Sequence, residues 1–124
     1  MNEAKFREIY NESRNGANSM TRHPLVRSFL MSDGVIDLAD TGCWWLMDVL
    51  ATELPAVMIS EKETLLSVKV EVHKGKARIT ASGYADRVMP WKKANIWTDM
   101  PEGTWGFLLA REDGHSVLIL GTEY

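Results

Sequence analysis

The sequence has little of several features that define common classes of protein. Its 124 residues include one cysteine, Cys43, so no disulfide forms within the chain and nothing indicates an oxidising compartment. Uninterrupted apolar runs reach about five residues, whereas a membrane-spanning helix needs about 20, and we expect no membrane segment. The first ten residues, MNEAKFREIY, carry early acidic side chains and no apolar core. We therefore expect no signal peptide and a cytoplasmic protein.

Basic excess and ligand-binding motifs are also missing. The chain has 17 acidic and 14 basic residues, a net charge of −3, while nucleic-acid-binding proteins usually show a clear basic excess. We therefore expect no direct contact with nucleic acid. The phosphate-binding patterns GxGxxG and GxxxxGK are absent. His23, His73 and His115 show neither HxxxH nor HxH spacing, so we expect no metal and no cofactor.

The apolar pattern predicts three short helices. Phe6, Ile9 and Tyr10 stand at helical spacing and predict a helix over residues 3–10, stopped near Gly16. Two more helices are expected, from Asp33 to about Gly42 and from about Cys43 to Leu54, the last ending at Pro55.

Alternation of apolar and polar residues predicts strands over residues 66–73 and 77–82, joined by a turn at Lys74-Gly75. Apolar runs predict strands over 26–31, 104–110 and 116–120, the last two central or under a helix and joined by the turn at 112–114. Segment 83–103 is expected to be a loop with a turn or short helix, packed on the sheet. The predicted fold is a single α+β domain over residues 1–124, with a five-stranded antiparallel sheet and about three short helices on one face.

Chemically active side chains flank the second and third helices. A catalytic interpretation would combine His23, Asp33 and Asp48, with Cys43 as nucleophile. A structural interpretation makes Asp33 the N-cap of its helix, accepting from Val35 or Ile36, and makes Cys43 a small buried side chain. Asp48 would then be exposed or bonded to a tryptophan N–H. We keep a small enzyme or ligand-binding domain as the alternative and assign no catalytic residue.

Four residues of the third helix have an expected structural role. They form an apolar face that fixes the helix to the sheet: Trp45, Leu46, Val49 and Leu50.

Acidic residues suggest a surface for a protein partner. Asp37 and Asp40 are three apart on one helix face, with Cβ atoms about 5–6 Å apart. Glu61 and Glu63 are expected to alternate at a strand start, about 6–7 Å apart. Such spacings resemble those of neighbouring phosphates, so this face could imitate nucleic acid for a basic partner. The alternative is an ordinary solvated face, diluted by nearby cations: Lys69, Arg78, Lys92 and Lys93.

Four motifs carry a resemblance to a known family. They are RHPL at 22–25, DGVxxLA at 33–39, WLxDxxA at 45–51, and TDxP at 98–101 followed by TEY at 122–124. In this order they resemble a family of small uncharacterised domains of bacterial and prophage proteins, domain of unknown function 6876. The family has no established activity, so the resemblance transfers no catalytic residue.

In size and charge the chain is also similar to the anti-CRISPR proteins of phages and mobile elements, particularly one directed at type I-C systems. This resemblance implies a five-stranded antiparallel sheet ringed by short helices. It further implies a non-enzymatic, stoichiometric inhibitor that works in the cytoplasm of the bacterial host. The partner would be a host protein or ribonucleoprotein, namely a CRISPR effector complex, bound by a monomer. An accessory protein of a mobile element, with tryptophans at an oligomer interface, is a further alternative.

Overall fold

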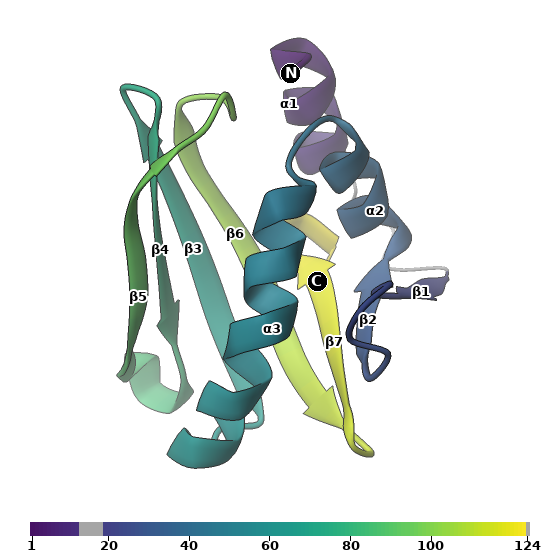
Figure 1. The fold of residues 1–124 in the computed structure, drawn as a ribbon, viewed down its shortest axis with the longest axis vertical. Helices are drawn as coiled ribbons and strands as arrows, with labels where there is room; N and C mark the ends of the chain where they lie inside the picture. The colour runs from purple at the N-terminus through teal and green to yellow at the C-terminus, as the bar shows by residue number, and fades with distance from the viewer. Residues whose placement is uncertain (13–18, 124) are drawn as a thin grey trace.

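The computed structural model describes residues 1–12 and 19–123, which form an α+β fold with three α-helices and a seven-stranded sheet (Figure 1). The predicted helix stop at Gly16 and the end of the TEY motif lie outside these residues. The helices are α1 (Glu3–Glu12), α2 (Asp33–Asp40) and α3 (Trp44–Glu61). The strands are β1 (Met20–Arg22), β2 (Phe29–Ser32), β3 (Leu65–His73), β4 (Lys76–Ser82), β5 (Val88–Trp97), β6 (Gly103–Glu112) and β7 (His115–Leu120). Two 3₁₀ turns, η1 (Tyr84–Asp86) and η2 (Gly121–Glu123), complete the described chain.

The sheet is mixed, and the prediction of five antiparallel strands was wrong in number and in direction. The strand order is β1-β2-β7-β6-β3-β4-β5, and β2 runs parallel to β7, with Leu30 opposite Val117. The two additional strands are β1 and β5, one at each edge. Because β2 and β7 are separated by most of the chain, no short connection constrains them to be antiparallel.

Both predicted hairpins are confirmed. β3 and β4 pair in register from Ser67 with Ser82 to His73 with Lys76. Lys74 and Gly75 turn the chain with positive φ angles of 51° and 75°, as a two-residue hairpin turn of this kind requires. β6 is the central strand of the seven and β7 lies beside it, as expected from their apolar residues.

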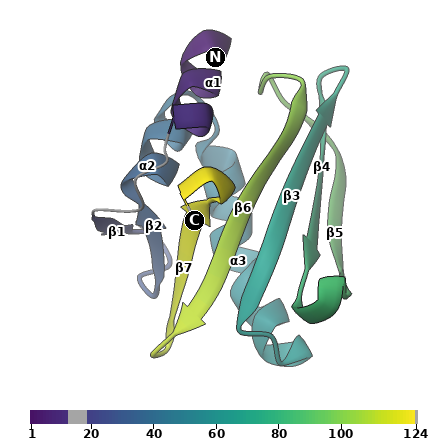
Figure 2. The same cartoon turned by 180° about the vertical axis from the view of Figure 1, so that it is seen from behind.

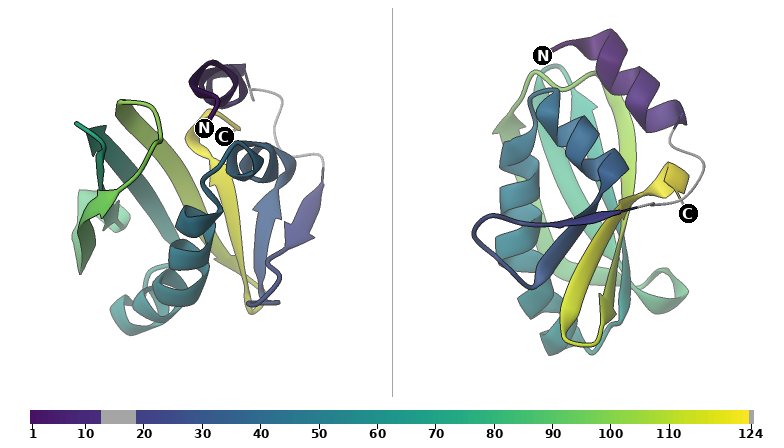
Figure 3. Two further views of the ribbon diagram at one scale, coloured as in Figure 1. Left: turned by 45° about the horizontal axis from the view of Figure 1, so that its top comes forward. Right: turned by 90° about the vertical axis from the view of Figure 1, so that its right-hand side faces the viewer.

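Helices α2 and α3 cover one face of the sheet, and the core lies between the two layers (Figures 1 and 3). The view from behind shows the other face of β3, β4 and β5 without a helix across it (Figure 2). Burial accordingly alternates at every residue of β3, because one side of the strand faces the core and the other faces water. Helix α1 packs at the end of the sheet, where the fully buried Phe6 contacts Trp105 edge to face.

Helix α3 continues to Glu61, so the prediction that it ends at Pro55 was wrong. A proline inside a helix removes one backbone hydrogen bond and costs about 3 kcal/mol. The turn beyond Pro55 places Met58 in the core with no exposed surface. Burying such a side chain stabilises by about 1.5–3 kcal/mol, which offsets most of the cost of the proline.

The expected apolar face of α3 is present in part. Leu46 and Leu50 are fully buried against the sheet, together with Leu54 from the next turn. Trp45 and Val49 pack at the margin of the core and are only partly buried. The centre of the buried face therefore passes through the leucines, with the tryptophan at its edge.

Candidate functional site

His23 and Asp48 come together, but in an arrangement that holds a loop. His23 is 1% exposed, and its Nε2 lies 2.8 Å from Oδ1 of Asp48 on α3. The Nδ1 atom accepts hydrogen bonds from the backbone amides of Leu25 (3.1 Å) and Val26 (3.2 Å). Since Nδ1 accepts, Nε2 carries the proton and donates it to Asp48. The ring cannot take a proton from a substrate without breaking one of these bonds.

Asp33, the third member of the proposed catalytic set, is engaged elsewhere. Its Oδ1 accepts from the amide of Gly34 at 3.1 Å, at the start of α2. Its predicted role as N-cap was wrong by one residue: the N-cap is Ser32, whose hydroxyl accepts from the amide of Val35 at 3.1 Å. Ser32 takes this position because β2 ends there and leaves it in an extended conformation.

Cys43 lies at the start of α3 with its side chain fully buried. Its thiol donates to the carbonyl of Leu38 at 3.5 Å. Burial, together with the nearby negative charge of Asp99, raises the pKa of this thiol to about 12. A thiolate is the nucleophilic form of cysteine, and at neutral pH this side chain stays protonated.

Glu61 and Glu63 do not lie together at a strand start as predicted: Glu61 is the last residue of α3, and Glu63 lies in the connection before β3. Arg87 binds both, with nitrogen–oxygen distances of 2.9 Å to Glu61 and 3.0 Å to Glu63. The Tyr84 amide also donates to Glu63 at 3.1 Å, and these bonds from Tyr84 and Arg87 lower the pKa of Glu63. One guanidinium binds both carboxylates, so the three side chains together carry a net charge of −1 and the oxygens of the pair are already engaged by Arg87.

Asp37 and Asp40 are exposed on α2. Asp40 accepts from the indole N–H of Trp44 at 2.8 Å, and none of the described residues forms an ion pair with Asp37 or Asp40. Asp33 precedes Asp37 by four residues, so the three carboxylates follow one side of the helix. We call Asp33, Asp37 and Asp40 the α2 acidic stripe.

Two carboxylates of the stripe stand where the helix itself disfavours them. Asp37 and Asp40 occupy the last turn of α2, which contains no basic residue. The carbonyl end of a helix carries partial negative charge, so an acidic side chain there costs on the order of 0.3–1 kcal/mol. Asp37 and Asp40 also line a groove of about 540 Å³ between α1 and α2, with Lys5 and Ile9 on its other side.

Sequence reasoning missed a buried carboxylate, Glu123. It is 6% exposed, and its Oε1 accepts from the Ser32 hydroxyl at 2.6 Å and from the Leu120 amide at 2.8 Å. Its carboxylate also lies over Gly34, where a Cβ would come within 2.7 Å. A glutamate three residues past an apolar strand gives no signal of burial, because glutamate is almost always exposed.

The motifs that carry the family resemblance meet in pairs. His23 of RHPL bonds Asp48 of WLxDxxA, and Glu123 of the terminal motif closes on Gly34 of DGVxxLA. These contacts join the β1–β2 loop to α3, and η2 to the start of α2. These motif residues thus hold elements together, and their polar groups are bonded within the fold.

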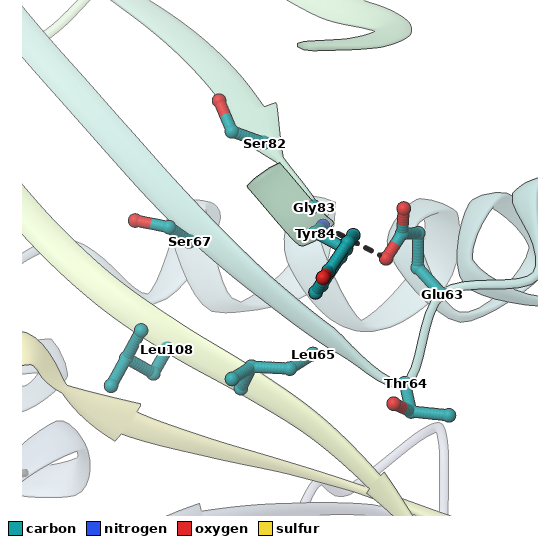
Figure 4. A pocket seen from close by; sticks show the side chains of 8 residues that line it. All are labelled: Glu63, Thr64, Leu65, Ser67, Ser82, Gly83, Tyr84 and Leu108. Atoms are coloured by element: carbon teal, nitrogen blue, oxygen red, sulfur yellow. Dashed lines mark hydrogen bonds between the residues drawn. The ribbon is translucent and has the colours of Figure 1, made fainter. Parts of the chain in front are cut away.

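A small pocket of about 310 Å³ opens at one end of β3 and β4, beside Tyr84 (Figure 4). Leu65 and Leu108 line it together with the hydroxyls of Ser67 and Ser82. Within residues 1–12 and 19–123, no three His, Cys, Asp or Glu side chains gather in a group suited to a metal ion. None of the helices in the same residues has the length and apolar character to traverse a bilayer.

Comparison with known proteins gives one match. Neither the curated proteins nor the solved structures include a significant match to the chain. A family model covers residues 11–124, nearly the whole sequence and all four motifs. The chain therefore belongs to the family of unknown function DUF6876.

Proposed function

We propose that the protein is a non-enzymatic binding protein that presents the α2 acidic stripe to a basic surface of a partner. The observation that carries the proposal is the position of Asp37 and Asp40. Both are exposed and unpaired with any described cation, and both lie against the helix dipole. Charges that cost the free protein stability can be compensated by a cationic partner.

Four other carboxylates are engaged within the fold, which supports the choice of α2. Glu61 and Glu63 are bound by Arg87, Glu53 pairs with Lys93 at 2.9 Å, and Asp48 accepts from His23. Asp37 and Asp40, in contrast, form no ion pair with the described residues.

The partner we propose is a type I CRISPR effector complex of a bacterial host, bound at a surface that otherwise holds target DNA. This rests on the similarity of the chain to anti-CRISPR proteins in size and charge, and on the spacing of the stripe. Carboxylates three and four residues apart on a helix stand about 5–6 Å from one another and can meet the lysines and arginines that contact DNA phosphates. The protein would act stoichiometrically in the host cytoplasm.

The test measures binding of the purified chain to a type I-C effector complex, with target DNA as competitor. Asp37→Lys should weaken binding at least tenfold at low salt, and Asp40→Asn should weaken it while keeping an oxygen for Trp44. Both variants should melt at or above the temperature of the wild type, because each removes a charge from the wrong end of α2. Glu112→Lys, at the exposed β6–β7 turn, is the matched control and should bind normally. Absence of binding at low salt would refute the proposal.

A further inference from the structure

A second surface lies on the opposite side of the molecule from α3. The uncovered side of β3, β4 and β5 faces the viewer in Figure 2, with α3 behind the strands. We call this surface the open face. It is formed by Ser67, Lys69, Glu71 and His73 of β3, Lys76, Arg78, Thr80 and Ser82 of β4, and Lys92 and Trp97 of β5.

The open face is basic although the chain as a whole is acidic. Strand pairing places Lys69 and Lys92 on either side of Thr80, and Arg78 and Lys76 follow on β4. Four cations thus stand against one carboxylate, Glu71, which lies 3.7 Å from Lys69. Arg78 and Lys92 make no ion pair with the described residues.

A second carboxylate, Glu102, stands at the hairpin end of this surface and is already engaged. It accepts from the Lys74 amide at 2.7 Å and lies 3.1 Å from His73. With Glu71 it leaves two carboxylates beside the four cations of the open face.

A β-bulge places a large aromatic ring beside these cations. Ile79 pairs with Lys93 and Ala77 with Ile96, so β5 has one residue more than β4 over this stretch. Asn95 takes a positive φ of 58° within the bulge. One inserted residue reverses which side the following side chains face, so Trp97 lies on the open face opposite Lys76.

Trp97 is 75% exposed, and the Lys76 ammonium lies 4.7 Å from the centre of its ring. A tryptophan that is 75% exposed on a basic surface buries little of its apolar area on folding. Its ring is available to stack on a planar ligand.

The far end of the open face offers a second aromatic group. The 310 Å³ pocket lies there, with Leu65 and Leu108 in its lining, and Tyr84 stands beside it at 86% exposure (Figure 4). The seven pairs from Ser67–Ser82 to His73–Lys76 are separated by six residue steps, about 20 Å of strand. The surface is therefore a track with an aromatic ring near each end and cations from Lys69 to the hairpin end, while Glu63 lines the pocket at the other end.

We propose that the open face binds a single-stranded nucleic acid. Lys69, Arg78 and Lys92 contact phosphates, and Trp97 stacks on a base. Single strands are bound in this way elsewhere, by a basic track combined with exposed aromatic rings. This departs from the expectation drawn from the net charge, which gives no information about how charge is distributed.

Other occupants fit the open face less well. A duplex presents phosphates but keeps its bases stacked, so Trp97 would have no partner. An acidic protein would satisfy the cations but offers no regular series of planar rings. The inference does not depend on the α2 acidic stripe, because the two surfaces share no residue.

The experiment is a fluorescence anisotropy titration of end-labelled 12-nucleotide strands of oligo(dT) and oligo(U) at 20–200 mM salt. The slope of log affinity against log salt should be about −2 to −3, as expected when three or four phosphates are neutralised. Trp97→Ala should weaken binding about 5- to 100-fold, and Trp97→Phe should restore most of it. Arg78→Gln and Lys92→Gln should each reduce the slope by about 0.7.

Two controls fix the interpretation. Lys5→Gln removes an exposed cation from α1 and should leave affinity unchanged, and thermal melting should show that each variant is folded. Three results would overturn the proposal: no binding at 20 mM salt, affinity for a 12-base-pair duplex equal to that for the single strands, or wild-type affinity in Trp97→Ala.

Discussion

Gly34→Ala is expected to destabilise the wild-type protein but to stabilise the Glu123→Ala variant. Gly34 lies in the first turn of α2, and a Cβ there would come within 2.7 Å of the carboxyl carbon and Oε2 of Glu123. The carboxylate is buried, and its Oε1 accepts from the Ser32 hydroxyl and the Leu120 amide. A methyl group can enter only if the carboxylate moves, which breaks both hydrogen bonds.

The magnitude follows from these two bonds. A hydrogen bond to a charged group contributes about 1.5–3 kcal/mol, and alanine is favoured over glycine in a helix by up to about 1 kcal/mol. Gly34→Ala should therefore lower the free energy of unfolding by about 2–5 kcal/mol, and Glu123→Ala by about 3–6 kcal/mol. In the Glu123→Ala background no carboxylate opposes the methyl group. There Gly34→Ala should raise the free energy of unfolding by up to about 1 kcal/mol.

The assay is urea denaturation of the four proteins of this double-mutant cycle, followed by circular dichroism. The account predicts a coupling free energy of several kcal/mol between Gly34 and Glu123. If Gly34→Ala costs the same in both backgrounds, the methyl group clashes elsewhere and the proposed contact is not the cause. Glu123→Gln, which keeps an oxygen for Ser32 and Leu120, should lose less stability than Glu123→Ala.

Three further predictions concern side chains of the candidate site. His23→Ala should lower the free energy of unfolding by about 2–4 kcal/mol, because two loop amides lose their acceptor. Asp48→Asn should lower it by less than about 1 kcal/mol, because the amide oxygen of Asn still accepts from Nε2 of His23. Equal losses for the two variants in urea denaturation would contradict the tautomer in which Nε2 carries the proton. Cys43, with a pKa of about 12, should react with iodoacetamide at pH 8 only in the unfolded chain, and labelling of the native protein at the unfolded rate would contradict its burial. Since folding lowers the pKa of Glu63 from 4.5, its contribution to stability is present above about pH 4.5 and is lost as the pH falls through the folded value. The stability difference between wild type and Glu63→Gln should therefore shrink on acidification, and a difference that grows below pH 4.5 would contradict the bond to Arg87.

The sequence predicts those elements whose pattern is local and uninterrupted. Residues 66–73 alternate strictly and are followed by Lys74-Gly75, so both the β3 strand and its hairpin could be predicted. The two missing strands lack such a pattern. β1 is exposed at all three residues, and the alternation of β5 is broken by the bulge at 94–95. A strand with no buried face, or with a change of face in its middle, gives no period-two signal.

The candidate site depends on contacts between distant residues, which the sequence does not indicate. Arg87 lies 26 residues from Glu61 and 24 from Glu63, yet it binds both and removes them from the predicted acidic face. The exposure of Asp37 and Asp40 could be predicted, because it follows from helical spacing alone. The net charge of −3 does not show how the charges are distributed, with acidic residues on α2 and basic residues on the open face.

Binding of the α2 acidic stripe to a basic partner surface can be measured in one comparison. Binding of wild type, Asp37→Lys and Glu112→Lys to a purified type I-C effector complex is measured by biolayer interferometry at 50 mM and 300 mM salt. The account predicts that target DNA competes with the wild type, that Asp37→Lys binds at least tenfold more weakly at 50 mM salt, and that Glu112→Lys matches the wild type. Equal affinities for all three proteins, or no binding of the wild type at 50 mM salt, would contradict this proposal.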